Sequence, residues 1–134
     1  MEIIKSSVHP QIIKVEIGAE YNETQKKLVG TVELDIENQA HFVDVINAIF
    51  EEGRVYVLVD MQHVSYIDSS GLWALFEGHK KAAQKSGKLV LLQPTKDVKR
   101  VLDITKMSSK IQVFLEEAQA IEQLLGEGEL ADRV

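Results

Sequence analysis

The stretch YVLVDMQHVSYIDSSGLWALF, residues 56–76, contains the change from strand-like to helix-like sequence on which the fold depends. It begins with a short, nearly continuous apolar run, which is typical of a central strand covered on both faces. Asp68, Ser69, Ser70 and Gly71 follow that run, and an amphipathic helical pattern starts immediately after them. The function of the chain therefore depends on what two serines do at the start of a helix.

The segments on either side alternate between strands and helices. Short apolar runs predict strands at 11–18, 26–35, 54–60, 88–93 and 111–115. Periodic apolar positions predict helices from Asn38 to Gly53, from Leu72 to Gly87, after Pro94 and over residues 116–125. Such alternation favours parallel strands joined by helical crossovers. We therefore expect an α/β fold, a mixed β-sheet with an edge hairpin packed with about four α-helices.

Length and composition indicate one folded domain. With 134 residues and 45% hydrophobic content, the chain can form a single core. We expect that domain to span residues 1–125, with residues 1–24 as an extra N-terminal strand or hairpin segment and residues 126–134 as a frayed C-terminal tail. The chain has no apolar stretch approaching the ~18 residues of a membrane span, no apolar signal-peptide core and no cysteine. A cytoplasmic protein is therefore expected.

The net charge of −6 is unevenly distributed. Residues 1–67 hold five Lys or Arg against eleven Asp or Glu, whereas the stretch from Lys80 to Lys110 holds nine basic residues against Asp97 and Asp103. An acidic domain argues against general nucleic-acid binding, which favours a basic domain. The simplest interpretation of the basic stretch is that its lysines coat the outer faces of helices. Contact of this stretch with a partner is the open alternative.

Several polar segments fall directly after predicted strands. In open sheets of this kind, ligand and partner sites lie beyond the carboxyl ends of the strands. Asp35, residues 60–70 and residues 93–95 all follow strand ends, so we expect them to share one rim of the molecule. The serine cluster is thereby predicted to lie at the functional edge.

Three chemical functions for the serine cluster have little support. A serine hydrolase would need a nucleophile elbow and a base within reach, yet the G-x-S-x-G pattern is absent and none of the four histidines is a recognisable partner. A nucleotide or flavin site would need several glycines and usually a lysine, but Gly71 stands alone. His, Asp and Glu residues do not show the spacing of a metal site. We therefore expect no catalytic residue, no metal and no cofactor.

Helix capping and phosphorylation remain as functions of the cluster. A Ser or Asp side chain at a helix start accepts hydrogen bonds from free N–H groups, worth about 1 kcal/mol, but one residue suffices for that role. A phosphoserine adds about −1.5 to −2 charges, which the N-terminus of a helix partly compensates. Beside Asp68, the added charge would alter what can dock on the rim without unfolding the domain. Capping and a phosphorylation switch therefore both remain open from the residues alone.

These residues resemble the hallmark of the STAS domain family, named for sulfate transporters and anti-sigma factor antagonists. In that family an apolar strand runs through a D-x-S-x-x-D-S-S/T/A-G-L pattern into a helix. The matching positions here are Asp60, Val64, Ile67, Asp68, Ser69, Ser70, Gly71 and Leu72. Residues 32–35 (VELD) and 97–124 are similar to further family segments, so that the resemblance covers most of residues 25–125. It implies a STAS-like mixed sheet packed with helices, in agreement with the order of elements.

The resemblance implies that this bacterial protein acts by binding and is not an enzyme. In anti-sigma factor antagonists the first serine of D-S-S-G, here Ser69, is phosphorylated by a serine kinase that is also the anti-sigma factor. The unphosphorylated form binds that kinase and frees the sigma factor, phosphorylation releases the antagonist, and a phosphatase resets the cycle. The partner-binding residues implied here are Asp35, Asp68, Ser70, Gly71, Leu72 and Trp73.

Several features depart from the family pattern, among them Val32 in place of a glycine and the replacement of a late Gly-Leu around Met107 and Ser108. Trp73, the single tryptophan, stands where the family has a small residue, and it either packs under a neighbouring loop or forms an exposed anchor for a partner. The longer N-terminal segment, residues 1–24, is expected to add a strand or a self-association surface, which leaves a homodimer open. The alternative function implied by the resemblance is a constitutive STAS interaction subunit of a lipid or anion transporter, in which the serines only cap the helix.

Overall fold

The computed structural model describes residues 1–132, and the side chains of residues 1–126. In chain order, its elements are β1 (Glu2–His9), β2 (Ile12–Gly18), β3 (Glu20–Asn22), β4 (Lys27–Val29), β5 (Val32–Leu34), α1 (Gln39–Glu51), β6 (Tyr56–Asp60), β7 (Val64–Ile67), α2 (Ser69–Gln84), β8 (Lys88–Leu92), α3 (Lys96–Ile104), the 3₁₀ helix η1 (Met107–Ser109), β9 (Val113–Phe114) and α4 (Glu117–Asp132). The central sheet has the order β1-β2-β6-β8-β9. Strands β2, β6, β8 and β9 are parallel, and β1 is antiparallel at one edge. The predicted α/β fold with a mixed sheet is confirmed.

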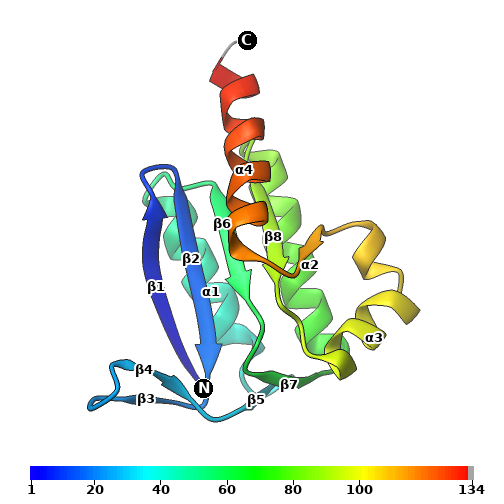
Figure 1. Ribbon diagram of the computed structural model, residues 1–134. Coiled ribbons are helices and arrows are strands. Elements are labelled where there is room, and N and C mark those ends of the chain that lie inside the picture. The colour runs from blue at the N-terminus through cyan, green and yellow to red at the C-terminus, as the bar shows by residue number, and fades with distance from the viewer. Residues whose placement is uncertain (133–134) are drawn as a thin grey trace.

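Helices cover both faces of the central sheet, with α1 and α2 on one face and α4 on the other (Figure 1). Alternating residues of β6 therefore enter different cores: Val57 and Val59 pack under α1 and α2, whereas Leu58 packs under α4 with Ala120 and Leu124. Because both faces are covered, this strand has no solvent side. That burial explains the continuous apolar run in its sequence.

The first two strands form the antiparallel edge of the sheet. Arg54, just before β6, ties their turn to the sheet through its Nη2 atom. This nitrogen donates hydrogen bonds to Ser7 Oγ at 2.9 Å, to the His9 carbonyl at 3.1 Å and to the Ile12 carbonyl at 3.0 Å. The edge hairpin of the sheet thus lies at the very N-terminal end of the chain.

The single strand predicted over residues 26–35 is wrong. Gly30 has a φ of +75°, a left-handed conformation that favours glycine, and it divides this segment into β4 and β5. Strand β4 pairs with β3 in a small hairpin, and β5 pairs with β7 as a separate parallel pair. Neither half of the predicted strand belongs to the central sheet.

The sequence pattern did not predict β7 as a separate strand after β6. Asp60 Oδ1 accepts a hydrogen bond from the Gln62 backbone N–H at 3.0 Å, and the Val64 N–H donates to the Met61 carbonyl at 3.0 Å. These local bonds turn the chain after β6, so that β7 leaves the central sheet and joins β5. The β5–β7 pair lies at the lower edge of the molecule in Figure 1, beneath the central sheet.

The last helix is longer than predicted. Its expected end at Leu125 is wrong, because α4 continues to Asp132. The added residues include no proline, and an interior glycine weakens a helix by only about 1 kcal/mol, so nothing local forces an end at Gly126. Of the tail predicted for residues 126–134, residues 133 and 134 lie outside the described part of the chain.

Candidate functional site

The two serines occupy the first turn of α2, immediately after β7. Ser69 is the first residue of the helix and is exposed, whereas Ser70 is half-buried. Within the described part of the chain, neither hydroxyl has a hydrogen-bond partner. The backbone alone therefore holds the two serines in place, and their hydroxyl groups make no hydrogen bond within the described residues.

Asp68 caps the helix. Its Oδ1 atom accepts a hydrogen bond from the Gly71 N–H at 3.0 Å, and its carbonyl oxygen accepts from the Leu72 N–H at 3.0 Å. The Asp68 N–H in turn donates to the Leu34 carbonyl at 3.3 Å, which ties the helix start to β5. Asp68 thus accepts the hydrogen bonds that cap the start of α2, and the serines are not needed for capping.

Gly71 allows the end of β5 to lie directly against α2. A β-carbon at this position would collide with the Leu34 carbonyl oxygen and with the Ile67 side chain. Only a residue without a side chain permits such an approach. Asp35 follows Leu34, so its half-buried carboxylate is brought to the same rim as Ser69.

The loop after β5 fixes Asp35. The Asp35 N–H donates to Asn38 Oδ1 at 2.9 Å, and its carboxylate Oδ1 accepts from the Glu37 N–H at 3.0 Å. The side chain of Asn38 is used in this loop and makes no capping hydrogen bond to α1. The two hydrogen bonds of Asp35 fix its position in the loop.

The rim around the start of α2 is acidic. Residues 28–53 and 55–79 contain no Lys or Arg, so these two segments supply no cation. They contribute Glu33, Asp35, Glu37 and Asp68 in the β5 and β7 strands and the loops that follow them. A phosphate on Ser69 would therefore meet helix N–H groups and carboxylates from these segments, and no lysine or arginine from them.

Trp73 lies in the next turn of α2 with 52% of its surface exposed. Of the two predicted alternatives, the structure shows the exposed one. Its neighbour Leu72 is half-buried against the core under α1 and α2. In the loop after β5 and in β7, sequence reasoning missed two exposed apolar residues, Ile36 at 72% and Tyr66 at 48%. Ile36 could have been found, because it is an apolar residue between two acids in a predicted loop.

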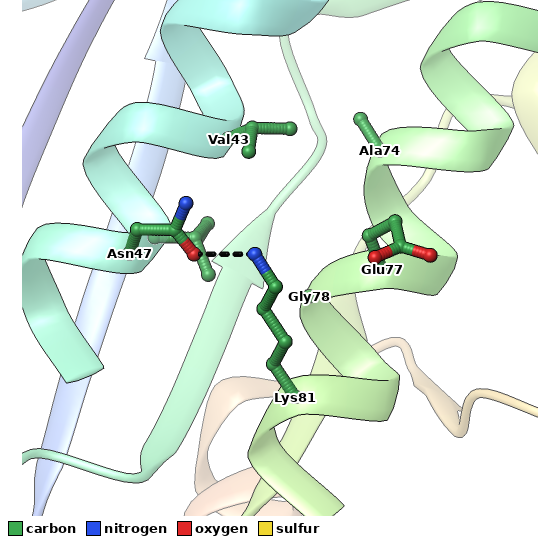
Figure 2. Close-up of a pocket in the computed structure, with 7 residues that line it drawn as sticks. Val43, Asn47, Ala74, Glu77, Gly78 and Lys81 are labelled. Atoms are coloured by element: carbon green, nitrogen blue, oxygen red, sulfur yellow. Dashed lines mark hydrogen bonds between the residues drawn. The ribbon is translucent and has the colours of Figure 1, made fainter.

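At least four of the eight lysines in the basic stretch have contacts that account for their side chains. The pairs are Lys80 with Glu77 at 3.0 Å, Lys99 with Asp103 at 2.7 Å, Lys81 with Asn47 Oδ1 at 2.9 Å, and Lys110 over the Phe76 ring at 5.3 Å. Figure 2 shows Lys81 reaching from α2 to Asn47 on α1. The space around this bond has no room for a water molecule. It is a packed helix seam, not a ligand site.

His79 is too far from Ser69 to act as its general base. His79 lies ten residues along α2 from Ser69, about 15 Å at the rise of an α-helix, so it cannot serve as the base for that hydroxyl. Burial, together with the charge of Lys88, lowers the pKa of His79. Within the described residues no three His, Asp or Glu side chains converge as metal ligands, and no helix is long and apolar enough to cross a bilayer.

Two open grooves, of about 510 and 450 Å³, flank β4 on the far side of the hairpin. Both are lined by Glu16, Lys27 and Leu28, and neither is lined by Ser69 or Trp73. The rim that carries the serines is therefore separate from these grooves. Its exposed hydroxyl, carboxylates and indole suit contact with a macromolecular surface.

Comparison with known proteins identifies a family. The STAS domain profile matches residues 28–120. The anti-sigma-B factor antagonist of Staphylococcus epidermidis is 29% identical over 111 residues, which cover 82% of this chain and 90% of that protein. The low affinity sulfate transporter 3 of Stylosanthes hamata is 33% identical over 78 residues, 55% of this chain, but the match spans only 12% of the transporter.

Solved structures share the fold. SpoIIAA of Bacillus in its unphosphorylated form superposes with a TM-score of 0.70 at 17% identity, covering 93% of this chain and 97% of SpoIIAA. Its phosphorylated form gives a TM-score of 0.63 at 15% identity, covering 91% of this chain and 98% of SpoIIAA. At these identities the likeness establishes a common fold.

Proposed function

The chain belongs to the STAS domain family, and from this premise we propose that it is an anti-sigma factor antagonist regulated by phosphorylation of Ser69. One observation carries the proposal: Asp68 alone caps α2, so the exposed Ser69 hydroxyl has no structural task. The anti-sigma-B factor antagonist of Staphylococcus epidermidis, which aligns over most of both chains, supports the same function.

The partner is an anti-sigma factor that is also a serine kinase. It docks on the rim formed by Asp35, Asp68, Ser70, Gly71, Leu72 and Trp73. In the modification step the Ser69 Oγ atom attacks the terminal phosphoryl group of a nucleoside triphosphate held by the kinase. A P–O bond to Oγ forms, the bond to the leaving nucleoside diphosphate breaks, and the hydroxyl proton is lost to the kinase.

Phosphorylation of Ser69 changes docking and leaves the fold intact. The free N–H groups at the start of α2 partly compensate the added charge, which the domain therefore tolerates. The neighbouring Asp35 and Asp68 make that charge part of a larger negative patch. A partner surface that fits the neutral hydroxyl then meets a bulky dianion, and the complex dissociates. A phosphatase resets the cycle, and the antagonist itself catalyses no reaction and works in the cytoplasm.

Peptide mass spectrometry of the protein from its native cells tests this function. A phosphate localised to Ser69 in part of the population is expected, together with stable binding of the Ser69→Ala variant to the anti-sigma factor and loss of that binding in Ser69→Glu. Ser6→Ala is the matched control, because Ser6 is an exposed serine of β1 outside the docking rim and its loss should leave phosphorylation of Ser69 in place. An unmodified Ser69 under all growth and stress conditions, with Ser69→Ala behaving as wild type, would contradict the proposal.

A second candidate rests on the alignment with the sulfate transporter, which is confined to a small part of that protein. The chain would then be a constitutive interaction subunit of a lipid or anion transporter. In that case Ser69 is never phosphorylated, and Ser69→Glu weakens binding only through its size. Co-purification with a membrane transporter, unaffected by Ser69→Ala, would favour this function over the first. Self-association of the protein, measured by light scattering at several concentrations, tests the homodimer separately.

A further inference from the structure

Ser69 and Trp73 lie one turn apart on the same outward stripe of α2. Residues four positions apart on a helix are surface neighbours, about 5–6 Å between their β-carbons. Ala74, Leu75 and Gly78, on the other faces of the helix, are buried. Ser69 and Trp73 are both exposed and therefore share the surface that points away from the core.

The indole of Trp73 is directed toward Ser69 by helix geometry. Long side chains in an α-helix point back toward its N-terminus and cover the preceding turn. The turn preceding Trp73 is the one that begins with Ser69. Trp73 as a whole residue is 52% exposed, so a large part of its surface is open to a partner.

A phosphate on Ser69 would repel an indole that lies over the first turn of α2 and turns its face toward the phosphate. The dianion carries about −1.5 to −2 charges, and the face of an aromatic ring is itself electronegative, so the two repel each other at contact. The ring edge is different, because the indole Nε1–H is a hydrogen-bond donor. Asp35 and Asp68, on the same rim, are acidic, so they cannot neutralise the charge of the phosphate beside the ring.

We propose that Trp73 is the second half of the switch: phosphorylation of Ser69 displaces the indole from the first turn of α2, so the partner loses an aromatic contact at the moment it meets the added charge. The inference rests on the proposed function and specifies its partner. The anti-sigma factor carries an apolar pocket for an indole one helical turn from the point where the Ser69 hydroxyl enters its phosphotransfer site. An anti-sigma factor adapted to a small residue at this position has no such pocket. Trp73 thereby determines which partner is bound.

The experiment uses the full chain with phosphoserine inserted at position 69 during translation, and with 5-fluorotryptophan in place of tryptophan. Trp73 is the single tryptophan, so the protein gives one ¹⁹F resonance. The matched control carries phosphoserine at position 70, which has the same charge on the same turn but is rotated about 100° around the helix. Urea unfolding of both proteins verifies that each is folded.

We expect a large ¹⁹F shift and a changed acrylamide quenching of the indole for phosphoserine at position 69, and a much smaller response for position 70. An unchanged resonance with phosphoserine at position 69, or equal responses at the two positions, would overturn the inference. Because the phosphate is installed without a kinase, the measurement is independent of whether a kinase for Ser69 exists. Failure of the proposed function and failure of this inference are therefore distinguishable.

Discussion

The carbonyl oxygen of Leu34 lies against Gly71, closer than any β-carbon at that position would permit. This approach fastens the end of β5 to the first turn of α2, with a supporting hydrogen bond from the Asp68 N–H to the same oxygen at 3.3 Å. As a result Asp35 and Ser69, distant in sequence, belong to one rim. The glycine of the serine cluster thus serves to assemble the site.

Replacement of Gly71 by alanine should destabilise the domain by about 1–3 kcal/mol, the usual cost of forcing an extra methyl group into a packed position. The collision is with backbone, which cannot move aside as a flexible side chain would. Urea unfolding measures the effect. Gly126→Ala in α4 is the control, because a β-carbon there meets nothing within 4 Å. It should stabilise the helix by about 0.5–1 kcal/mol, and a loss as large as that of Gly71→Ala would refute the packing argument.

Asp68→Ala should cost about 1 kcal/mol of unfolding free energy, as expected for loss of an N-cap. Its carboxylate accepts the hydrogen bond from Gly71, and the serines make no such bond. Ser69→Ala should therefore change stability by less than about 0.5 kcal/mol. Chemical denaturation of the two variants side by side checks the assignment. A greater loss for Ser69→Ala than for Asp68→Ala would show that the serine is the cap.

Lys14→Met should destabilise the domain by about 1–3 kcal/mol, because it leaves a buried charge without its cation. Asp60 is only 2% exposed, and Lys14 Nζ lies 3.7 Å from its Oδ2 atom. Two hydrogen bonds from Gln62, each at 3.0 Å, keep the loss from being larger. Glu117→Gln removes the other partner of Lys14, a carboxylate 39% exposed at 2.5 Å, and should cost less than about 1 kcal/mol. Equal losses in thermal or urea unfolding would contradict this ranking.

The pH dependence of the Lys14 cluster has a definite sign. Burial acts to lower the pKa of Lys14, but the hydrogen bond to Glu117 and the charges of Glu16, Glu117 and Asp60 outweigh it, so the pKa is raised above the ordinary value of 10.5. A raised pKa gives stability that is fully present below pH 10.5 and is lost as the pH rises through the higher folded value. The difference in stability between wild type and Lys14→Met should therefore be constant from pH 7 to about pH 10 in denaturant titrations. A steady decline across that range would argue against the cluster.

His79 should make the domain less stable in mild acid. Burial first, and Lys88 second, lower its pKa below the ordinary value of 6.5, so the folded state favours the neutral ring. The stability that the neutral ring contributes is fully present above pH 6.5. It is lost as the pH falls from 6.5 through the lower pKa of the folded state. His79→Gln, which cannot titrate, should lose less stability than wild type between pH 7.5 and about pH 5 in urea midpoints. Parallel curves for the two proteins would show that His79 does not contribute.

The sequence by itself determined the main order of strands and helices. Apolar periodicity is a local signal, so α1, α2, α3 and the parallel strands β6 and β8 could be predicted from short windows. The serine cluster and its position at a helix start could be predicted for the same reason. The motif also indicated the family before any packing was known.

Only the tertiary structure decided which strands pair, which side chain caps α2 and which apolar side chains are exposed. The separation of β5 and β7 from the central sheet follows from pairing between segments some thirty residues apart, which no local window contains. Asp68, Ser69 and Ser70 are all acceptable caps by residue type, and the choice of Asp68 depends on where β5 holds the helix start. The exposure of Trp73 is likewise set by which face of α2 the sheet and α1 cover. Such choices depend on the surroundings that distant parts of the chain create, and these exist only in the folded molecule.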